Sequence, residues 1–381
     1  MRQKIIRNSL GVLLLAALLS GCAKTEPQPH VHTWENYRCV SCGEEKEIQQ
    51  LGNWEYIFWE ETGTMEIISF LGNARAVPFR DMPEEVSSVQ IADGITDIPD
   101  AAFWGCETLV DVTLPQTLRT IGKNAFVQCV NLARINIPEG VTSIGGDAFF
   151  LCRSLTRLTI PDSVTSIEGN PFQYTSAEIQ VSPGNPAFSV TDGVLFNKEH
   201  TRLIACPCNK AGAYEIPEGV REIGVNAFQN CNDLTDVTIP ASVVSIEGNP
   251  FTYAQLELKL SPENPCFSLV DGVLFDETGT KLLVYPGGRA GDAYEIPEGT
   301  TGIGEFAFTG SQQLSSVTVP ENVTAIAPSA FWNCENLRLH VWDGSYALQY
   351  ALEHRLNFFY SLPDMGPEID ESDVLDGTTV P

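Results

Sequence analysis

The sequence predicts a β-rich (α+β) solenoid, in which short strands and short helical turns form coils that stack along one axis. A unit of 23 residues recurs eight times within residues 86–336. The eighteenth residue of every unit is Phe, the thirteenth is Ile, and the seventh is Pro in seven of the eight. One such unit cannot bury its apolar face alone, so a fixed period of this length indicates coils that stack on one another.

The order of apolar and polar residues inside one unit predicts the secondary structure of each of its segments. In Leu234–Ile239 the apolar residues alternate with polar ones, which predicts a half-buried strand. The proline that follows ends the strand, because it has no N–H to donate. A second extended stretch carries the apolar tenth and thirteenth residues. One face of a short helix or helical turn then carries Ala227, Phe228, Cys231 and Leu234.

Two units are longer than the others. Leu155–Asn209 and Leu234–Ala290 each contain Gly-Asn-Pro-Phe, a second Asn-Pro and Asp-Gly-Val-Leu-Phe, with the last motif repeated after 79 residues. Each is predicted to be a coil that bears a hairpin, produced by duplication. At about 4.8 Å per strand, roughly ten to twelve coils would form a rod of about 50 to 60 Å with one continuous core.

These residues closely resemble the BspA-like class of bacterial surface leucine-rich repeat, with its L-x-x-V-x-I-P-x-x-V-x-x-I-G-x-x-A-F-x-x-C unit. The resemblance covers residues 86–336, and the replacement of the opening Leu by Val86, Ala211 and Gly291 leaves the period intact. It implies a leucine-rich-repeat solenoid. It also implies adhesion, in which the protein binds extracellular proteins of a host or of neighbouring cells.

The ends of a solenoid need covering, because they expose unpaired strand edges. Residues 51–85 are predicted to form an N-terminal β cap. Residues 337–361 are predicted to form a C-terminal cap with a helix and a last strand. Residues 362–381 hold six acidic residues and no basic one, so we expect a disordered acidic tail.

The N-terminus resembles a bacterial lipoprotein signal peptide. Three basic residues precede the apolar run Leu10–Leu19, which is followed by Ser20-Gly21-Cys22. The run is shorter than the roughly 20 residues that a spanning helix needs. The resemblance implies cleavage after residue 21, lipid on Cys22, a polar tether over residues 22–29, and a lipid-anchored, extracytoplasmic position at the cell surface.

Residues 30–50 contain a candidate zinc knuckle. His30, His32, Cys39 and Cys42 lie within thirteen residues and supply a tetrahedral ligand set for Zn²⁺. A disulfide between Cys39 and Cys42, or two free thiols, is the alternative. The rest of the sequence requires no cofactor.

Composition and motifs argue against several classes of function. The net charge of −27 should repel nucleic acid. The sequence has no Gly-rich phosphate loop, nucleophile elbow or HExxH motif, so we expect no enzyme. Five cysteines share one repeat position, which favours small buried residues over a disulfide framework.

Aromatic residues just after the recurrent Phe are the candidate partner-binding residues. They are Trp104, Phe150, Tyr174, Tyr253 and Trp332. Exposed rings could hold a partner's apolar side chains or stack on sugars, and they could equally cover the turns. The first interpretation is binding of an extracellular protein, the second is binding of a glycan, and the third is a structural spacer without a dedicated ligand.

Overall fold

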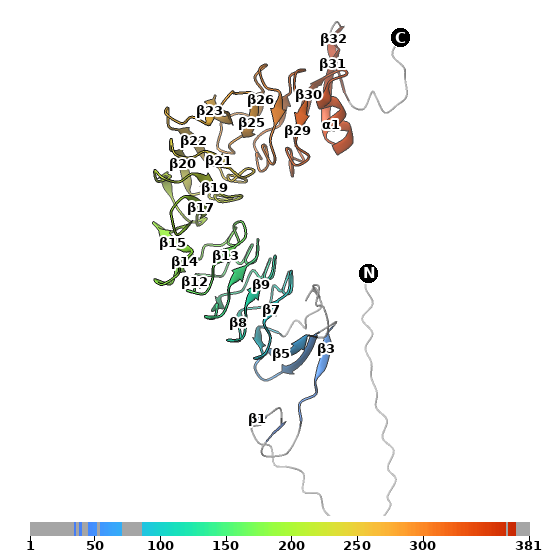
Figure 1. The fold of residues 1–381 in the computed structure, drawn as a ribbon. Coiled ribbons are helices and arrows are strands. Elements are labelled where there is room, and N and C mark those ends of the chain that lie inside the picture. The colour runs from blue at the N-terminus through green and yellow to red at the C-terminus, as the bar shows by residue number, and fades with distance from the viewer. Residues whose placement is uncertain are drawn as a thin grey trace, which may run out of the picture. The chain divides into compact units, whose positions relative to one another are not determined.

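The computed structural model describes residues 34–35, 38–39, 45–51, 54–70, 86–362 and 365–370. The chain divides into two units, Met1–Glu47 and Ile48–Pro381. In the first, β1 (Trp34–Glu35) pairs antiparallel with β2 (Arg38–Cys39). The second unit holds the repeats, and its coils stack in chain order (Figure 1). The structure thus confirms the predicted solenoid.

A three-stranded meander covers the first coil. It consists of β3 (Gln49–Leu51), β4 (Trp54–Trp59) and β5 (Thr64–Phe70), paired antiparallel. β5 then pairs in parallel with β6 (Ser88–Ile91), the first strand of the first repeat. Trp54 is buried, and its ring lies 5.9 Å from that of Phe103. The meander therefore continues the sheet and seals its apolar end.

Each repeat contributes two strands, and equivalent strands pair in parallel. Asp111 pairs with Arg134 and Ser143 with Ser166, so the register advances by one 23-residue unit per coil. Before the first hairpin, the first-strand series is β6, β8 (Asp111–Thr113), β10 (Arg134–Ile135), β12 (Arg157–Ile160) and β14 (Glu178–Val181). The second-strand series is β7 (Asp97–Ile98), β9 (Thr120–Ile121), β11 (Ser143–Ile144) and β13 (Ser166–Ile167).

The same two series continue after the first hairpin, and again after the second. The first strands are β18 (Gly212–Glu215), β20 (Leu234–Ile239), β22 (Glu257–Leu260), β26 (Ala293–Glu295), β28 (Ser316–Thr318) and β30 (Arg338–Trp342). The second strands are β19 (Glu222–Ile223), β21 (Ser245–Ile246), β27 (Gly302–Ile303) and β29 (Ala325–Ile326). The coils before, between and after the hairpins therefore share one arrangement of strands.

The third segment of each coil is a pair of tight turns, where the sequence suggested a helix or helical turn. In the second repeat, the sixteenth and twentieth residues, Asn124 and Gln128, have φ of 57° and 61°. A left-handed residue every fourth position prevents a helix from continuing. The backbone bonds to the next coil instead, as Phe103 N donates to Ala125 O at 2.7 Å. We call the side formed by these segments the turn face.

The recurrent Phe side chains stack behind the turn face. Ring centroids of Phe103, Phe126, Phe149 and Phe172 follow one another at 5.0, 5.5 and 6.0 Å. The column stops there, and shorter stacks join Phe228 to Phe251 and Phe308 to Phe331. The breaks coincide with the two long repeats.

Two segments of three antiparallel strands, which we call the hairpins, divide the core at these breaks. The first consists of β15 (Phe188–Thr191), β16 (Val194–Asn197) and β17 (Arg202–Ala205), and the second of β23 (Phe267–Val270), β24 (Val273–Asp276) and β25 (Lys281–Val284). On β16, Leu195 faces the preceding core, whereas Val194 and Phe196 face the following one. Successive strand side chains point to opposite faces, so a hairpin buried on both sides forms a wall. The single continuous core expected from the repeat is therefore wrong, and three clusters take its place.

Cysteines of the shared repeat position form hydrogen bonds to the backbone of the turn face. Cys129 Sγ lies 3.0 Å from Phe103 O and Cys152 Sγ lies 3.2 Å from Phe126 O, so each thiol donates to the carbonyl of the preceding coil. Each thiol satisfies a buried acceptor while filling little volume. These cysteines are free thiols.

The C-terminal end is closed by a helix and a hairpin. α1 (Tyr346–His354) begins after Ser345, whose Oγ accepts a hydrogen bond from Leu348 N. β31 (Asn357–Leu362) adds to β30, and β32 (Met365–Asp370) pairs antiparallel with β31. The expected disordered tail therefore begins with a strand, which pairs with the outer edge of β31.

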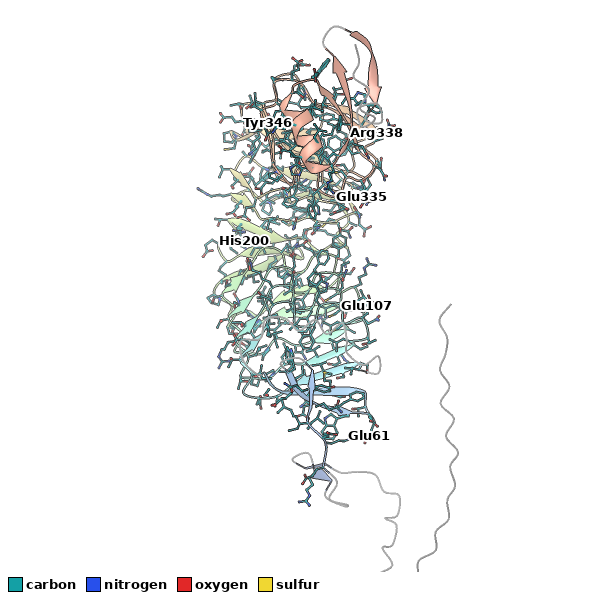
Figure 2. The ribbon with its side chains drawn as sticks, turned by 90° about the vertical axis from the view of Figure 1, so that its right-hand side faces the viewer. Glu61, Glu107, His200, Glu335, Arg338 and Tyr346 are labelled. Carbon is teal, nitrogen blue, oxygen red and sulfur yellow. The ribbon has the colours of Figure 1, made fainter. Side chains whose placement is uncertain are left out.

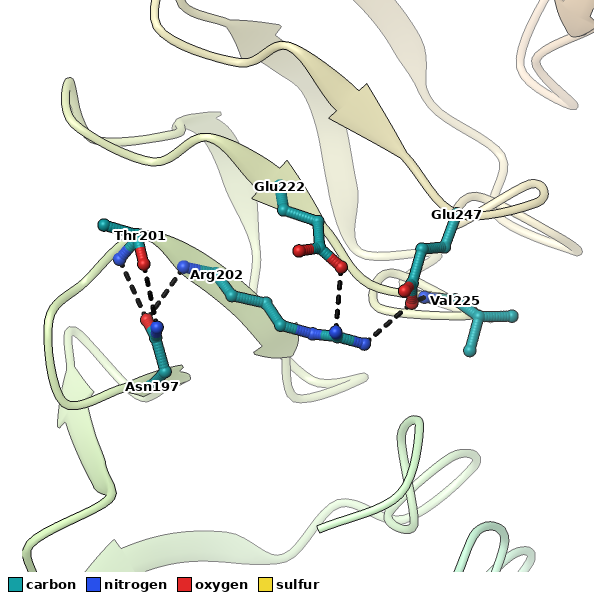
Figure 3. Close-up of polar contacts among 6 residues, drawn as sticks. All are labelled: Asn197, Thr201, Arg202, Glu222, Val225 and Glu247. Atoms are coloured by element: carbon teal, nitrogen blue, oxygen red, sulfur yellow. Dashed lines mark hydrogen bonds and ion pairs between the residues drawn. The ribbon is translucent and has the colours of Figure 1, made fainter. Parts of the chain in front are cut away.

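One arginine ties the first hairpin to the two coils that follow. Arg202 on β17 contacts Glu222 on β19 at 2.8 Å and Glu247, just after β21, at 2.7 Å (Figure 3). At the hairpin turn, Asn197 Oδ1 accepts hydrogen bonds from Thr201 N and Arg202 N, both at 2.8 Å. The guanidinium thus lies between two carboxylates that would otherwise repel each other.

Replacing this arginine should lower stability in a pH-dependent way. Burial raises the pKa of the Glu222 carboxyl above its ordinary value, and Glu247 adds to the rise while Arg202 opposes it. Ionised Glu222 therefore costs folding free energy above the raised pKa, and protonation removes this cost as pH falls through it. Arg202→Gln should lower the free energy of unfolding by about 1 kcal/mol at neutral pH, and by less near pH 4. Urea denaturation at the two pH values tests this, and an equal loss at both would contradict it.

Candidate binding groove

The nineteenth residue of every repeat lines one groove on the turn face. Its volume is about 600 Å³. These residues are Trp104, Val127, Phe150, Gln173, Gln229, Thr252, Thr309 and Trp332. Because they occupy one register position, the stacking of coils places them in a row along the groove.

The coils converge on this face and keep the groove continuous past both hairpins. Asn170 Nδ2 donates to Asn226 O at 2.9 Å, and Asn249 Nδ2 donates to Phe306 O at 3.0 Å. Each bond joins the coil before a hairpin directly to the coil after it. His200, at the first hairpin's tip, lies on the opposite edge of the stack from residues that follow the turn segments, such as Glu107 (Figure 2). The hairpins thus widen the stack elsewhere and leave the groove unbroken.

The structure brings all five predicted aromatic residues to this groove. The rings of Phe150 and Tyr174 meet edge to face at 5.2 Å, and those of Tyr174 and Tyr253 lie 6.3 Å apart. Trp104 and Trp332 come from the first and last repeats and are 47% and 64% exposed. The five rings therefore line the groove together, and two of them are accessible indoles.

Polar side chains line the groove among the rings. Gln173 Nε2 donates to Asn170 O at 2.7 Å and to a carboxylate oxygen of Asp147. Burial raises the pKa of the Asp147 carboxyl above its ordinary value, while the Gln173 hydrogen bond opposes the rise. Gln229 Oε1 and Thr309 Oγ1 are buried without a hydrogen-bond partner. Such atoms are costly to leave unpaired, which makes them candidate contacts for a ligand.

Sequence reasoning missed these amides and hydroxyls. The signal was present, because Gln173, Gln229, Thr252 and Thr309 occupy the same repeat position as Trp104, Phe150 and Trp332. Charged groups in the lining are limited to Asp147 and Arg153. The large acidic surplus of the chain therefore lies mostly outside the groove.

Three ion pairs join neighbouring first strands of the coils. Arg134 Nη2 lies 2.8 Å from Asp111 Oδ2, and Lys259 Nζ lies 2.7 Å from Asp236 Oδ1. Arg157 and Glu178 form a third cross-coil pair at 3.2 Å. Exposed pairs of this kind contribute little to stability.

The other predicted site residues lie mainly outside the described part of the chain. Cys22, His30, His32 and Cys42 fall outside it, and Cys39 lies in β2. The described residues contain no group of three or more His, Cys, Asp or Glu side chains able to hold a metal ion. Within that same part of the chain, no helix combines the length and apolar character required to cross a membrane.

The coils and the groove define a class of protein: a tandem-repeat solenoid with an extended surface groove. The model of the BspA type leucine rich repeat region matches residues 79–187, 206–264 and 292–346, in six copies. These segments cover more than half of the chain, which therefore belongs to this family of leucine-rich-repeat proteins. A comparison with curated proteins finds no match.

Several solved bacterial structures are similar to the chain. A leucine-rich repeat protein from Eubacterium ventriosum is 21% identical, with a TM-score of 0.48, covering 76% of this chain and 82% of that one. A leucine rich cell surface protein from Faecalibacterium prausnitzii is 25% identical, with a TM-score of 0.41 and coverage of 82% and 99%. The pneumococcal vaccine antigen PcpA is 17% identical, with a TM-score of 0.46 and coverage of 84% and 99%.

Proposed function

We propose that this protein is a lipid-anchored cell-surface adhesin, which binds an extracellular protein of a host or neighbouring cell through the turn-face groove. One observation carries the proposal: all eight repeats contribute the same register position to a single groove with an exposed tryptophan from each end of the array. Extended surfaces built in this way are what repeat proteins use to bind partners.

The side chains of the groove suit a protein partner. Tryptophan and tyrosine dominate the binding energy of protein interfaces, because they bury much apolar area and lose little conformational entropy. Trp104 and Trp332 are available to a partner, while Tyr253 is held by a 2.9 Å hydrogen bond from Asn333. Exposed indoles beside less exposed rings would let an apolar loop of the partner insert between them.

Anchoring and metal binding rest on the sequence. Lipid on Cys22 would hold the protein at the outer side of a membrane, since two or three acyl chains anchor stably. The zinc site of His30, His32, Cys39 and Cys42 remains a proposal alongside it. Neither feature is needed for the groove to bind its partner.

Glycan binding is the second candidate. The observation that favours it is the mixture of aromatic rings with amide and hydroxyl groups, including the unpaired atoms of Gln229 and Thr309. Rings that stack on sugars and polar groups that bond to hydroxyls are the usual requirements of a saccharide site. Competition experiments separate the two candidates.

The test is the double variant Trp104→Ala/Trp332→Ala of the full chain, probed against arrays of extracellular proteins and glycans. Loss of both indoles should weaken binding about 30-fold or more, as expected for two interface tryptophans. Tyr346→Ala is the matched control, because Tyr346 is an exposed ring, 42% accessible, outside the groove lining. Unchanged affinity of the double variant would contradict the groove as the site. Competition by saccharides but not by proteins would favour the glycan candidate.

A further inference from the structure

Three thiols meet where the first hairpin returns to the repeats. Cys206 and Cys208 flank Pro207 just after β17, and Cys231 follows the turn segment of the next repeat. The backbone oxygen of Gln229 lies 3.5 Å from the Sγ of Cys208 and 3.9 Å from the Sγ of Cys231, so both thiols lie against one carbonyl. Cys231 Sγ also lies 3.7 Å from Cys206 O. Cys231 occupies the shared cysteine position, but its thiol contacts the carbonyl of Cys206, whereas those of Cys129 and Cys152 donate to a Phe carbonyl.

Duplication provides an internal comparison. The second long module carries the same plan, but Tyr285 and Gly287 stand where the first has Cys206 and Cys208, and Ser311 stands where the first has Cys231. The fold therefore does not require thiols at these positions. All three are present in one copy and all three are absent from the other.

We propose that Cys208 and Cys231 form a disulfide on exposure to a disulfide oxidant, which closes one coil covalently. Cys208 is the accessible member, being half-buried, whereas Cys206 and Cys231 are buried. The Cys208 thiolate attacks one sulfur of the oxidant and releases one thiolate. Cys231 then loses its proton and attacks Cys208 Sγ, releasing the second. The two thiols give up two protons and two electrons, and the oxidant becomes two thiols.

The surroundings favour this order of attack. The hydrogen bond from Cys231 lowers the pKa of the Cys208 thiol, which increases its thiolate fraction. Hydrogen bonds to Cys206 and Cys208, together with burial, raise the pKa of the Cys231 thiol. Cys106, Cys129 and Cys152 also stack closely, but all three are buried and offer an oxidant no access.

The experiment treats the full chain with oxidised glutathione, alkylates the free thiols under denaturing conditions and digests with trypsin. A cross-link between the peptides Leu203–Lys210 and Glu222–Lys259, assigned to Cys208 by fragmentation, is the expected result. Cys206→Ser should keep the cross-link, Cys208→Ser should abolish it, and Cys334→Ser is the control without a neighbouring thiol. Oxidation should raise the midpoint of thermal unfolding by roughly 5 to 10 °C, and only where Cys208 is present.

Three outcomes would overturn the proposal. The first is a bond between Cys206 and Cys208 within one peptide. The second is glutathione retained on Cys208, because Cys231 would then fail to reach it. The third is full alkylation of all three thiols after oxidation.

Discussion

Phe126→Ala should lower the free energy of unfolding by about 3 to 5 kcal/mol, the usual range for a buried phenylalanine. The Phe126 ring is fully buried and lies between Phe103 at 5.0 Å and Phe149 at 5.5 Å. Truncation would leave a cavity that the flanking coils cannot fill without breaking their own strand pairing. Urea denaturation followed by circular dichroism measures the loss.

Trp104→Ala is the control for this experiment. Trp104 comes from the preceding repeat and is 47% exposed, so its removal creates no cavity. It should cost less than about 1 kcal/mol. If the two substitutions cost the same, the Phe column would not be the interior of the solenoid.

Asn185→Ala should be comparably destabilising, at about 3 to 5 kcal/mol, because it removes four hydrogen bonds from a buried site. Asn185 Nδ2 donates to Pro161 O at 2.7 Å and to Val164 O at 3.0 Å. Its Oδ1 accepts from Ala187 N and Phe188 N, both at 2.8 Å. The side chain thus fixes the start of the first hairpin to the preceding coil. Thermal unfolding of the variant measures the loss.

The chain supplies two comparisons for this substitution. Asn264, 79 residues later, makes the same four bonds in the second module, at 2.7, 3.0, 2.9 and 3.1 Å. Asn264→Ala should therefore cost a similar amount. Asn131 makes one exposed hydrogen bond, to Glu107 O, and Asn131→Ala should cost about 1 kcal/mol or less. A small effect at Asn185 and Asn264 alike would show that the hairpins are held by packing alone.

The repeat register was predictable because it depends on local periodicity. Ile and Phe at fixed positions indicated stacking, and the structure places both in columns. The turns were less clear, because the spacing of Ala227, Phe228 and Cys231 also fits one face of a helix. The residues at the two left-handed positions are often Asn, Asp or Gly, which tolerate positive φ, so a signal for turns existed.

The division of the core was not predictable from an alternating pattern. Val194, Leu195 and Phe196 form an unbroken apolar run, and such a run indicates a strand buried on both faces without saying what lies on each side. The aromatic lining of the groove could be predicted, because its rings come just after the recurrent Phe in the sequence. The polar lining of the groove could not be predicted, because Gln and Thr at one repeat position resemble ordinary surface residues until the coils are stacked.

The two hairpin walls also govern how such an array changes length. Each wall presents one apolar surface to the block before it and another to the block after it, and the motifs that build the walls recur after 79 residues. A recombination event that adds or deletes one whole block would join surfaces that already fit. The groove would lengthen or shorten by complete repeats. Its length could therefore change without any change in the residues that line its two ends.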